Sequence, residues 1–113
     1  MPSAHNTKLI GHIDCDGGGQ VWVDGNLLYV AHMKAPSGTS IYDISDPSKP
    51  ELLSKIELPN GWHSHKVRVK NGIMIVNREE NGPRDVLQPG QNFQGGLMIY
   101  DVSNPAAPKP ITK

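Results

Sequence analysis

The chain contains two copies of one sequence unit. Residues 41–50 (IYDISDPSKP) return as residues 99–108 (IYDVSNPAAP), and residues 21–31 return in related form as residues 67–77. Internal repetition on this scale is typical of architectures in which one supersecondary unit stacks on its neighbours. The repeat therefore limits the fold more strongly than any single motif does.

Each copy predicts a series of short β-strands. Apolar and polar residues alternate around the turns at residues 24–26 and 71–72, the pattern of an antiparallel hairpin with one buried face. Residues 41–44 and 97–102 predict third strands, each followed by an Asx-Pro turn. Residues 51–58 predict a fourth strand, and no segment combines a helix start signal with a period of 3.6 residues.

Four sequential antiparallel strands are typical of a β-propeller blade, so we expect an all-β fold and one partial β-propeller over residues 1–113. A lone N-terminal outer strand is expected at residues 8–13. The first blade is expected at residues 18–58 and a second, incomplete blade at residues 62–113. A Greek-key sandwich is the alternative, although its strands need not resemble one another in sets of four.

Two blades cannot close a ring, because a propeller needs at least four. Each blade also has an apolar face that a neighbour must cover. Residues 73–76 (IMIV) are apolar throughout, which predicts a strand covered on both faces. We therefore expect the missing blades to come from a longer parent chain or from self-association.

Charge, cysteine content and hydropathy limit which classes of partner and which cellular location the sequence favours. Lys plus Arg and Asp plus Glu both total 11, so nothing in the charge favours nucleic acid or an anionic membrane as partner. Cys15 is the only cysteine, which excludes an intrachain disulfide. No segment is apolar over the length of a signal peptide core or a membrane span. We expect a cytoplasmic protein, or an extracellular one if the chain is incomplete.

The repeated strand that ends in Tyr-Asp-Ile/Val-Ser-Asx-Pro-x-x-Pro, at residues 41–50 and 99–108, resembles the LVIVD-repeat family. Residues 21–31 resemble the preceding part of that repeat: Val-x-Val, a Gly/Asn turn and a Tyr-Val-Ala type strand. The resemblance covers roughly residues 8–113. It implies a propeller of mostly unassigned role, often on bacterial surfaces, and it carries no catalytic residues. This chain departs from the surface examples because it has no secretion signal.

Strand direction gathers the chemically active residues on one face of the propeller. Successive strands alternate in direction, so the loops before the first strand and between the second and third share a face. These loops are residues 14–20, 32–38, 60–66 and 78–96. The last is an insertion with the length of a functional lid or a disordered loop. We expect it to be a flap that orders on binding, or a plain solvated loop.

His63 and His65 point to the same side if their backbone is extended, so both imidazoles could ligate one metal ion. His32 is the expected third ligand, with Asp14 and Asp16 as alternatives. Three ligands and an open position would make a Lewis-acid or metal-hydroxide site. Alternatively, both imidazoles bond to the backbone. The cofactor expected is thus a divalent metal ion or none.

Other residues on the same loops extend this candidate site. The full set of candidate ligand-binding residues is Trp62, His63, His65, Lys66, Arg78 and Glu79. Trp62 either packs between blades or stacks on a ligand. Cys15 is less favoured as a nucleophile, and the glycines at 17–19 are less favoured as an anion cradle, because no helix follows them.

We expect a binding module whose loop face holds a small molecule or a partner protein. The alternative is a metal-dependent hydrolase or oxidoreductase that uses His32, His63 and His65. A third interpretation is a structural fragment without activity of its own.

Overall fold

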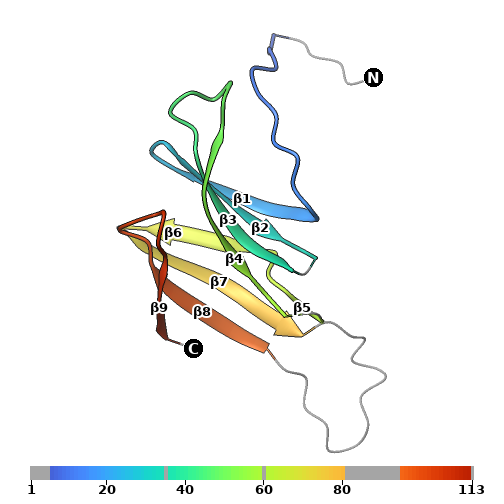
Figure 1. Ribbon diagram of the computed structural model, residues 1–113, viewed down its shortest axis with the longest axis vertical. Coiled ribbons are helices and arrows are strands. Elements are labelled where there is room, and N and C mark those ends of the chain that lie inside the picture. The colour runs from blue at the N-terminus through green and yellow to red at the C-terminus, as the bar shows by residue number, and fades with distance from the viewer. Residues whose placement is uncertain (1–5, 35, 60, 81–94, 113) are drawn as a thin grey trace, which may run out of the picture.

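The chain folds into two antiparallel β-sheets in the computed structural model, which describes residues 6–34, 36–59, 61–80 and 95–112 (Figure 1). The first sheet pairs, in chain order, β1 (Gly18–Asp24), β2 (Leu27–His32), β3 (Ser37–Asp43) and β4 (Glu51–Glu57). The second contains β5 (Trp62–His63), β6 (Val67–Lys70), β7 (Ile73–Glu80), β8 (Gly95–Asp101) and β9 (Lys109–Thr112). This confirms the predicted all-β class, and the sheets are consistent with two neighbouring propeller blades.

The inner strand of the second sheet is interrupted. Both β5 and β6 pair with β7, so together they take the place that β1 has in the first sheet.

The described part of the chain contains no helix long and apolar enough to cross a membrane.

The predicted hairpin turns form where the sequence places them. Gly25 between β1 and β2 has a φ of 60°, and Asn71 and Gly72 between β6 and β7 have φ values of 52° and 76°. A two-residue turn with positive φ matches the right-handed twist of the flanking strands. Gly and Asn adopt such angles at lower cost than other residues.

Asp43 and Asp101 end equivalent strands of the two copies and cap the turns that follow. Oδ1 of Asp43 accepts hydrogen bonds from the amide and hydroxyl of Ser45, at 2.8 and 2.5 Å. Asp101 accepts from the amide of Ser103 at 2.9 Å and from its hydroxyl. These bonds, the hydroxyl first and the amide second, lower the pKa of both carboxyls below the ordinary 3.8.

The hydrophobic core lies between the two sheets. From the first sheet it takes Tyr29, Ala31 and Ile41, and from the second Val67, Val69, Met74, Val76, Tyr100 and Val102. Trp22 packs against this core, and the guanidinium carbon of Arg68 in β6 lies 5.1 Å from its ring centre. Trp22 therefore lies at the junction of the two sheets, consistent with packing between blades.

Hydrogen bonds also join the inner strands of the two sheets. The Gln20 amide donates to the His65 carbonyl oxygen at 3.0 Å, and Gln20 Oε1 accepts from the Val67 amide at 2.9 Å. The carbonyl oxygen of His32 accepts from the Ser64 amide at 3.2 Å. The residues between β5 and β6 are thus held against the first sheet, and this positions His63 and His65.

Among the described residues, strand β7 is buried on one face and partly exposed on the other, so the predicted cover on both faces stays a prediction that needs a further neighbour. Met74 and Val76 are buried, whereas Ile73 and Ile75 are 39% and 40% exposed. Leu97, on the neighbouring strand β8, is 59% exposed. Alternating side chains point to opposite faces of a strand, so the exposed set forms the face that points away from the core.

Two segments differ from expectation. Residues 8–13 form no strand and run beside Leu28 of β2 and beside Ile44 and Pro47 of the β3–β4 connection. The outer strand predicted there needs a partner sheet and stays a prediction.

Arg78 and Glu79 pair with Gly96 and Gly95 and so extend the β7–β8 ladder. The loop predicted at 78–96 is therefore too long at both ends. The rest of that insertion, 81–94, lies outside the described residues.

Candidate functional site

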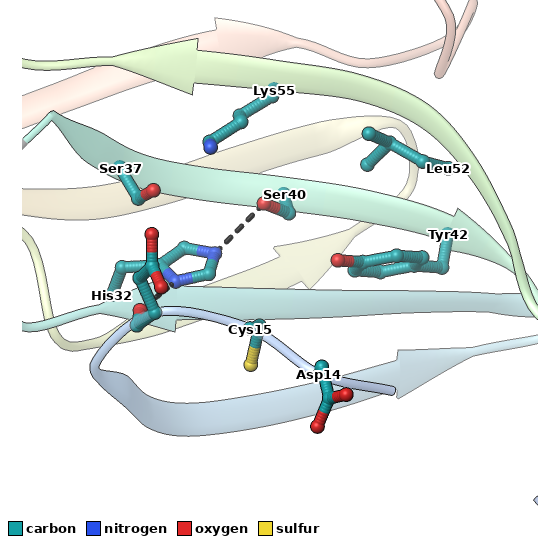
Figure 2. A pocket seen from close by; sticks show the side chains of 9 residues that line it. Asp14, Cys15, His32, Ser37, Ser40, Tyr42, Leu52 and Lys55 are labelled. Carbon is teal, nitrogen blue, oxygen red and sulfur yellow. Dashed lines mark hydrogen bonds between the residues drawn. The ribbon is translucent and has the colours of Figure 1, made fainter. Parts of the chain in front are cut away.

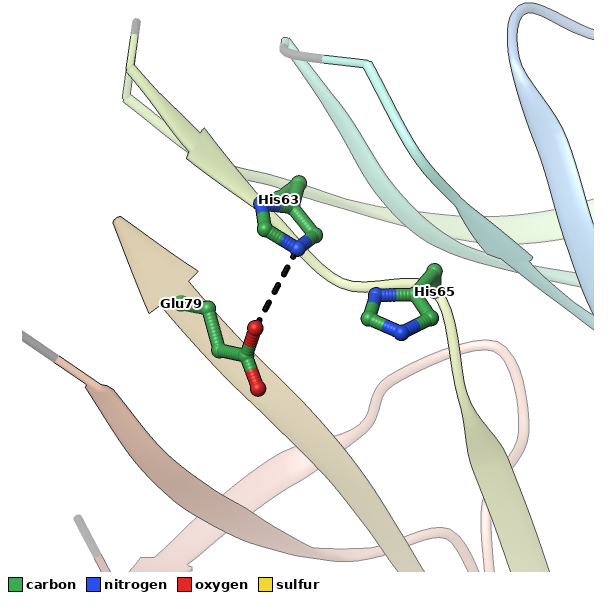
Figure 3. Close-up of side chains that lie close together, drawn as sticks. All are labelled: His63, His65 and Glu79. Atoms are coloured by element: carbon green, nitrogen blue, oxygen red, sulfur yellow. Dashed lines mark ion pairs between the residues drawn. The ribbon is translucent and has the colours of Figure 1, made fainter. Parts of the chain in front are cut away.

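His63, His65 and Glu79 converge at one edge of the second sheet (Figure 3). Each offers one ligand atom, and these atoms all lie within 4.8 Å of one another. His63 Nε2 lies 3.4 Å from Glu79 Oε2. The two imidazole rings are stacked, with centroids 5.0 Å apart and an interplanar angle of 25°. We call these three residues the His/Glu cluster.

Strand pairing explains the convergence. Glu79 of β7 lies directly opposite His63 of β5, and directly paired side chains project from the same face of a sheet. His65 follows His63 by two residues, and Figure 3 places its imidazole beside that of His63. This is the arrangement that extended backbone was expected to give.

Asn77 orients His65. Its Oδ1 accepts hydrogen bonds from the amides of His65 and Lys66, at 3.0 and 2.9 Å. Because an oxygen must face those two donors, the amide nitrogen of Asn77 faces His65 Nδ1 at 3.2 Å. Asn77 thus replaces the ladder bonds missing between β5 and β6 and also fixes the His65 ring.

The His/Glu cluster is partly shielded from water. The side chain of His63 is 19% exposed and that of Glu79 is 36% exposed, and His65 is also half-buried. Partial burial strengthens attraction between a cation and the carboxylate while leaving a path from solvent. Two imidazoles and one carboxylate are a ligand set that divalent transition metals accept.

His32 does not join this cluster. It is buried, and its Nδ1 donates to the Asp16 carbonyl oxygen at 2.6 Å while Nε2 bonds to Ser40 Oγ at 2.7 Å. Its side chain lines a separate cavity, together with Asp14 and Asp16 (Figure 2). The third residue beside the two histidines is therefore Glu79, which sequence reasoning assigned to the insertion loop. Extending the strand alternation of 73–77 by two residues places Glu79 on the same face as Asn77, but only the pairing of β5 with β7 places it opposite His63.

The other predicted ligand-binding residues lie beside the cluster. The Arg78 guanidinium carbon is 4.9 Å from the ring centre of Trp62, and these residues alternate along their strands with Glu79 and His63. They therefore face the other side of the ladder. Lys66 is exposed. A role in ligand binding for these three residues stays a prediction.

The His/Glu cluster occurs in one copy of the repeat only. When residues 21–31 are aligned with 67–77, the first-copy positions that correspond to His63, His65 and Glu79 hold Gly17, Gly19 and Met33. The backbone framework is thus repeated, but the side chains of the His/Glu cluster are not. The repeat does not require this cluster.

Comparison with known proteins gives a match to a family model. The model described as the LVIVD repeat matches residues 18–57 and 92–111. The first segment contains all four strands of the first sheet, and the second contains β8 and most of β9. The His/Glu cluster lies between the two matched segments. Searches of the curated proteins and of the solved structures found no match.

Proposed function

The chain belongs to the LVIVD-repeat family, a β-propeller-like repeat module, and we propose that it binds a divalent transition-metal ion through His63, His65 and Glu79. The convergence of these three side chains carries the proposal. In this proposal the protein is a binding module and the metal ion is its ligand. The repeat supplies the backbone framework, and side chains of the second copy supply the site.

The spacing of the ligand atoms supports a metal ion. Tetrahedral coordination with bonds of ~2.1 Å separates neighbouring ligand atoms by about 3.4 Å. His63 Nε2 and Glu79 Oε2 are already 3.4 Å apart. The remaining ligand atoms lie within 4.8 Å of one another, so the group is close to the size of a coordination shell.

The ligand set supports a transition metal over Ca²⁺ or Mg²⁺. Imidazole nitrogen suits Zn²⁺, Cu²⁺, Fe²⁺ and Ni²⁺, whereas Ca²⁺ and Mg²⁺ take oxygen ligands. The Asn77 amide nitrogen donates to His65 Nδ1, which leaves the proton of the neutral ring on Nε2. Metal binding through Nε2 therefore requires the other tautomer and the loss of this hydrogen bond.

A metal-dependent hydrolase or oxidoreductase is the second candidate function. Three protein ligands leave at least one coordination position for water or substrate, which is the arrangement of catalytic zinc sites. A bound water there would lose a proton more readily and become a nucleophile. His32 has no part in this version, because both of its ring nitrogens are hydrogen bonded elsewhere.

Titration of metal-free protein with Zn²⁺, in competition with a chromophoric chelator, tests the proposal. We expect one ion per chain. His63→Ala, His65→Ala and Glu79→Gln should each weaken binding at least ~10-fold, since even outer-shell changes cost that much. His12→Ala is the matched control, because His12 is an exposed imidazole that pairs with Asp14 and lies outside the His/Glu cluster. Binding that is absent, or unchanged in the triple variant, would contradict the proposal.

A further inference from the structure

A second site lies on the first sheet, on the face turned away from the core. It is a cavity of about 460 Å³ whose lining includes His32, Ser37, Ser40, Tyr42 and Lys55 (Figure 2). This volume falls within the range of small-molecule sites. His32, Ser37 and Ser40 are each 1% exposed, so the polar wall of the cavity is buried protein rather than outer surface.

His32 and Ser40 form a directed hydrogen-bond relay. A carbonyl oxygen only accepts, so the 2.6 Å contact to Asp16 places the proton on His32 Nδ1. Nε2 of a neutral imidazole is then an acceptor, and the Ser40 hydroxyl donates to it at 2.7 Å. A nucleophile bonded to a base that is itself oriented by a third group is the signature of an activated serine.

Ser37 adds an unused donor to the same space. Its Oγ is buried and has no hydrogen-bond partner in the described part of the chain. The register of β3 against β4 shifts between Ser37 and Thr39. Strand alternation would put Ser37 and Ser40 on opposite faces, and this bulge turns both toward the cavity.

Two further donors face Ser40. Lys55 is its direct partner in the β3–β4 ladder and makes no ion pair within the residues the structure covers. Burial first, and then the nearby Cys15, raise the pKa of Tyr42 above the ordinary 10.0, despite the opposing effect of a hydrogen bond with Ser40. The phenol therefore keeps its proton at neutral pH. Figure 2 shows the Tyr42, Ser37 and Lys55 polar atoms directed toward one space.

The blade fold does not require this relay. In the second copy, the positions that correspond to His32 and Ser40 hold Arg78 and Met98. The relay is therefore an individual feature of the first copy, as the His/Glu cluster is of the second.

We propose that Ser40 is a nucleophile activated by His32 and that the cavity accepts small carboxylic esters. Ser40 Oγ bonds to the ester carbonyl carbon while its proton passes to His32 Nε2. The Ser37 and Tyr42 hydroxyls and the Lys55 ammonium stabilise the negative oxygen that develops. The carbon–oxygen bond to the alcohol breaks, and His32 returns the proton to that leaving group. Water then attacks acyl-Ser40 with the same proton transfers and releases the carboxylic acid.

Labelling with diisopropyl fluorophosphate tests this proposal directly. Ser40 Oγ would bond to phosphorus and fluoride would leave, so peptide mass analysis should find one adduct, on Ser40. His32→Asn keeps a donor for the Asp16 carbonyl but removes the base, and should slow labelling by about 10²-fold or more. Ser54→Ala is the control, because the Ser54 hydroxyl is on β4 and donates to the Pro105 carbonyl oxygen.

The reaction is run with EDTA so that a metal ion at the His/Glu cluster has no part in it. No adduct, an adduct on another residue, or equal labelling of His32→Asn and wild type would overturn the proposal. If His32→Asn fails to fold, the adduct position in the wild-type protein decides the matter. A Ser40 adduct supports the proposal whether or not the protein binds Zn²⁺.

Discussion

Glu79 lies directly opposite His63 in the ladder between β5 and β7, and its Oε2 atom is 3.4 Å from His63 Nε2. The ladder brings together two side chains that are sixteen positions apart in the sequence. Next to the pair, toward β6, are His65, whose ring stacks on His63, and Asn77, which holds His65. The proposed metal site therefore depends on strand register for His63 and Glu79, and on the connection between β5 and β6 for His65.

Metal binding should raise the free energy of unfolding, because the ion binds the folded state. A ligand at one hundred times its dissociation constant adds about 2.7 kcal/mol to the free energy of unfolding. We expect a stabilisation of this size when Zn²⁺ is added to wild-type protein, measured by urea denaturation. Glu79→Gln should lose most of it and His12→Ala should keep it. An equal gain in Glu79→Gln would mean that the ion binds elsewhere.

Asn77 should contribute to stability through the two backbone amides that it satisfies. Asn77→Ala leaves both without a partner, and we expect it to lower the free energy of unfolding by about 1–3 kcal/mol. Asn77→Asp keeps an oxygen toward both amides and should cost less. Chemical denaturation of both variants measures the difference. Equal losses would show that the amide hydrogen bonds are not the cause.

Met74 and Ile75 lie on opposite faces of β7, so substitutions at the two positions test how much each face contributes to stability. Met74 is fully buried in the core, so Met74→Ala should cost about 2–5 kcal/mol of unfolding free energy. Ile75 is 40% exposed, and Ile75→Ala should cost less than about 1 kcal/mol. Denaturation midpoints and size-exclusion chromatography measure both. A large loss at Ile75, in a protein that elutes as an oligomer, would mean that another copy covers the exposed face.

Asp101 should make part of the stability depend on pH. Its folded-state pKa is lowered by the hydroxyl and amide of Ser103. A lowered pKa stabilises the folded state above the unfolded-state pKa, and this contribution is lost as pH falls through the folded-state pKa. Asp101→Asn should therefore be less stable than wild type at pH 7, and the gap should shrink below about pH 4. A gap that is the same at pH 7 and pH 3 would contradict this.

The repeated strands, the hairpin turns and the pairing of His63 with His65 could be predicted from sequence because each follows from local periodicity. The turn at Asn71-Gly72 and the Asp43 cap need only neighbouring residues. Glu79 and His32 could not be assigned this way. Their surroundings depend on register between strands: Glu79 faces His63 across a ladder, and His32 is bonded to Asp16 and Ser40 from two other segments.

The exposure of Ile75 was missed for a related reason. An apolar run predicts cover on both faces, but cover depends on which sheets are present to supply it. The side chains that face the first sheet are buried, and those on the other face have no neighbouring sheet among the described residues. Sequence periodicity predicts the strand, but it does not predict which sheet packs against each face.

X-ray absorption spectroscopy at the zinc edge of the 1:1 complex tests the central claim most directly. Zinc held by His63, His65 and Glu79 predicts a spectrum with scattering from two imidazole rings and oxygen neighbours at about 2.0–2.2 Å. His65→Ala should reduce the imidazole contribution to one ring. A first shell of oxygen atoms alone, unchanged by His65→Ala, would contradict the claim that this cluster binds the metal.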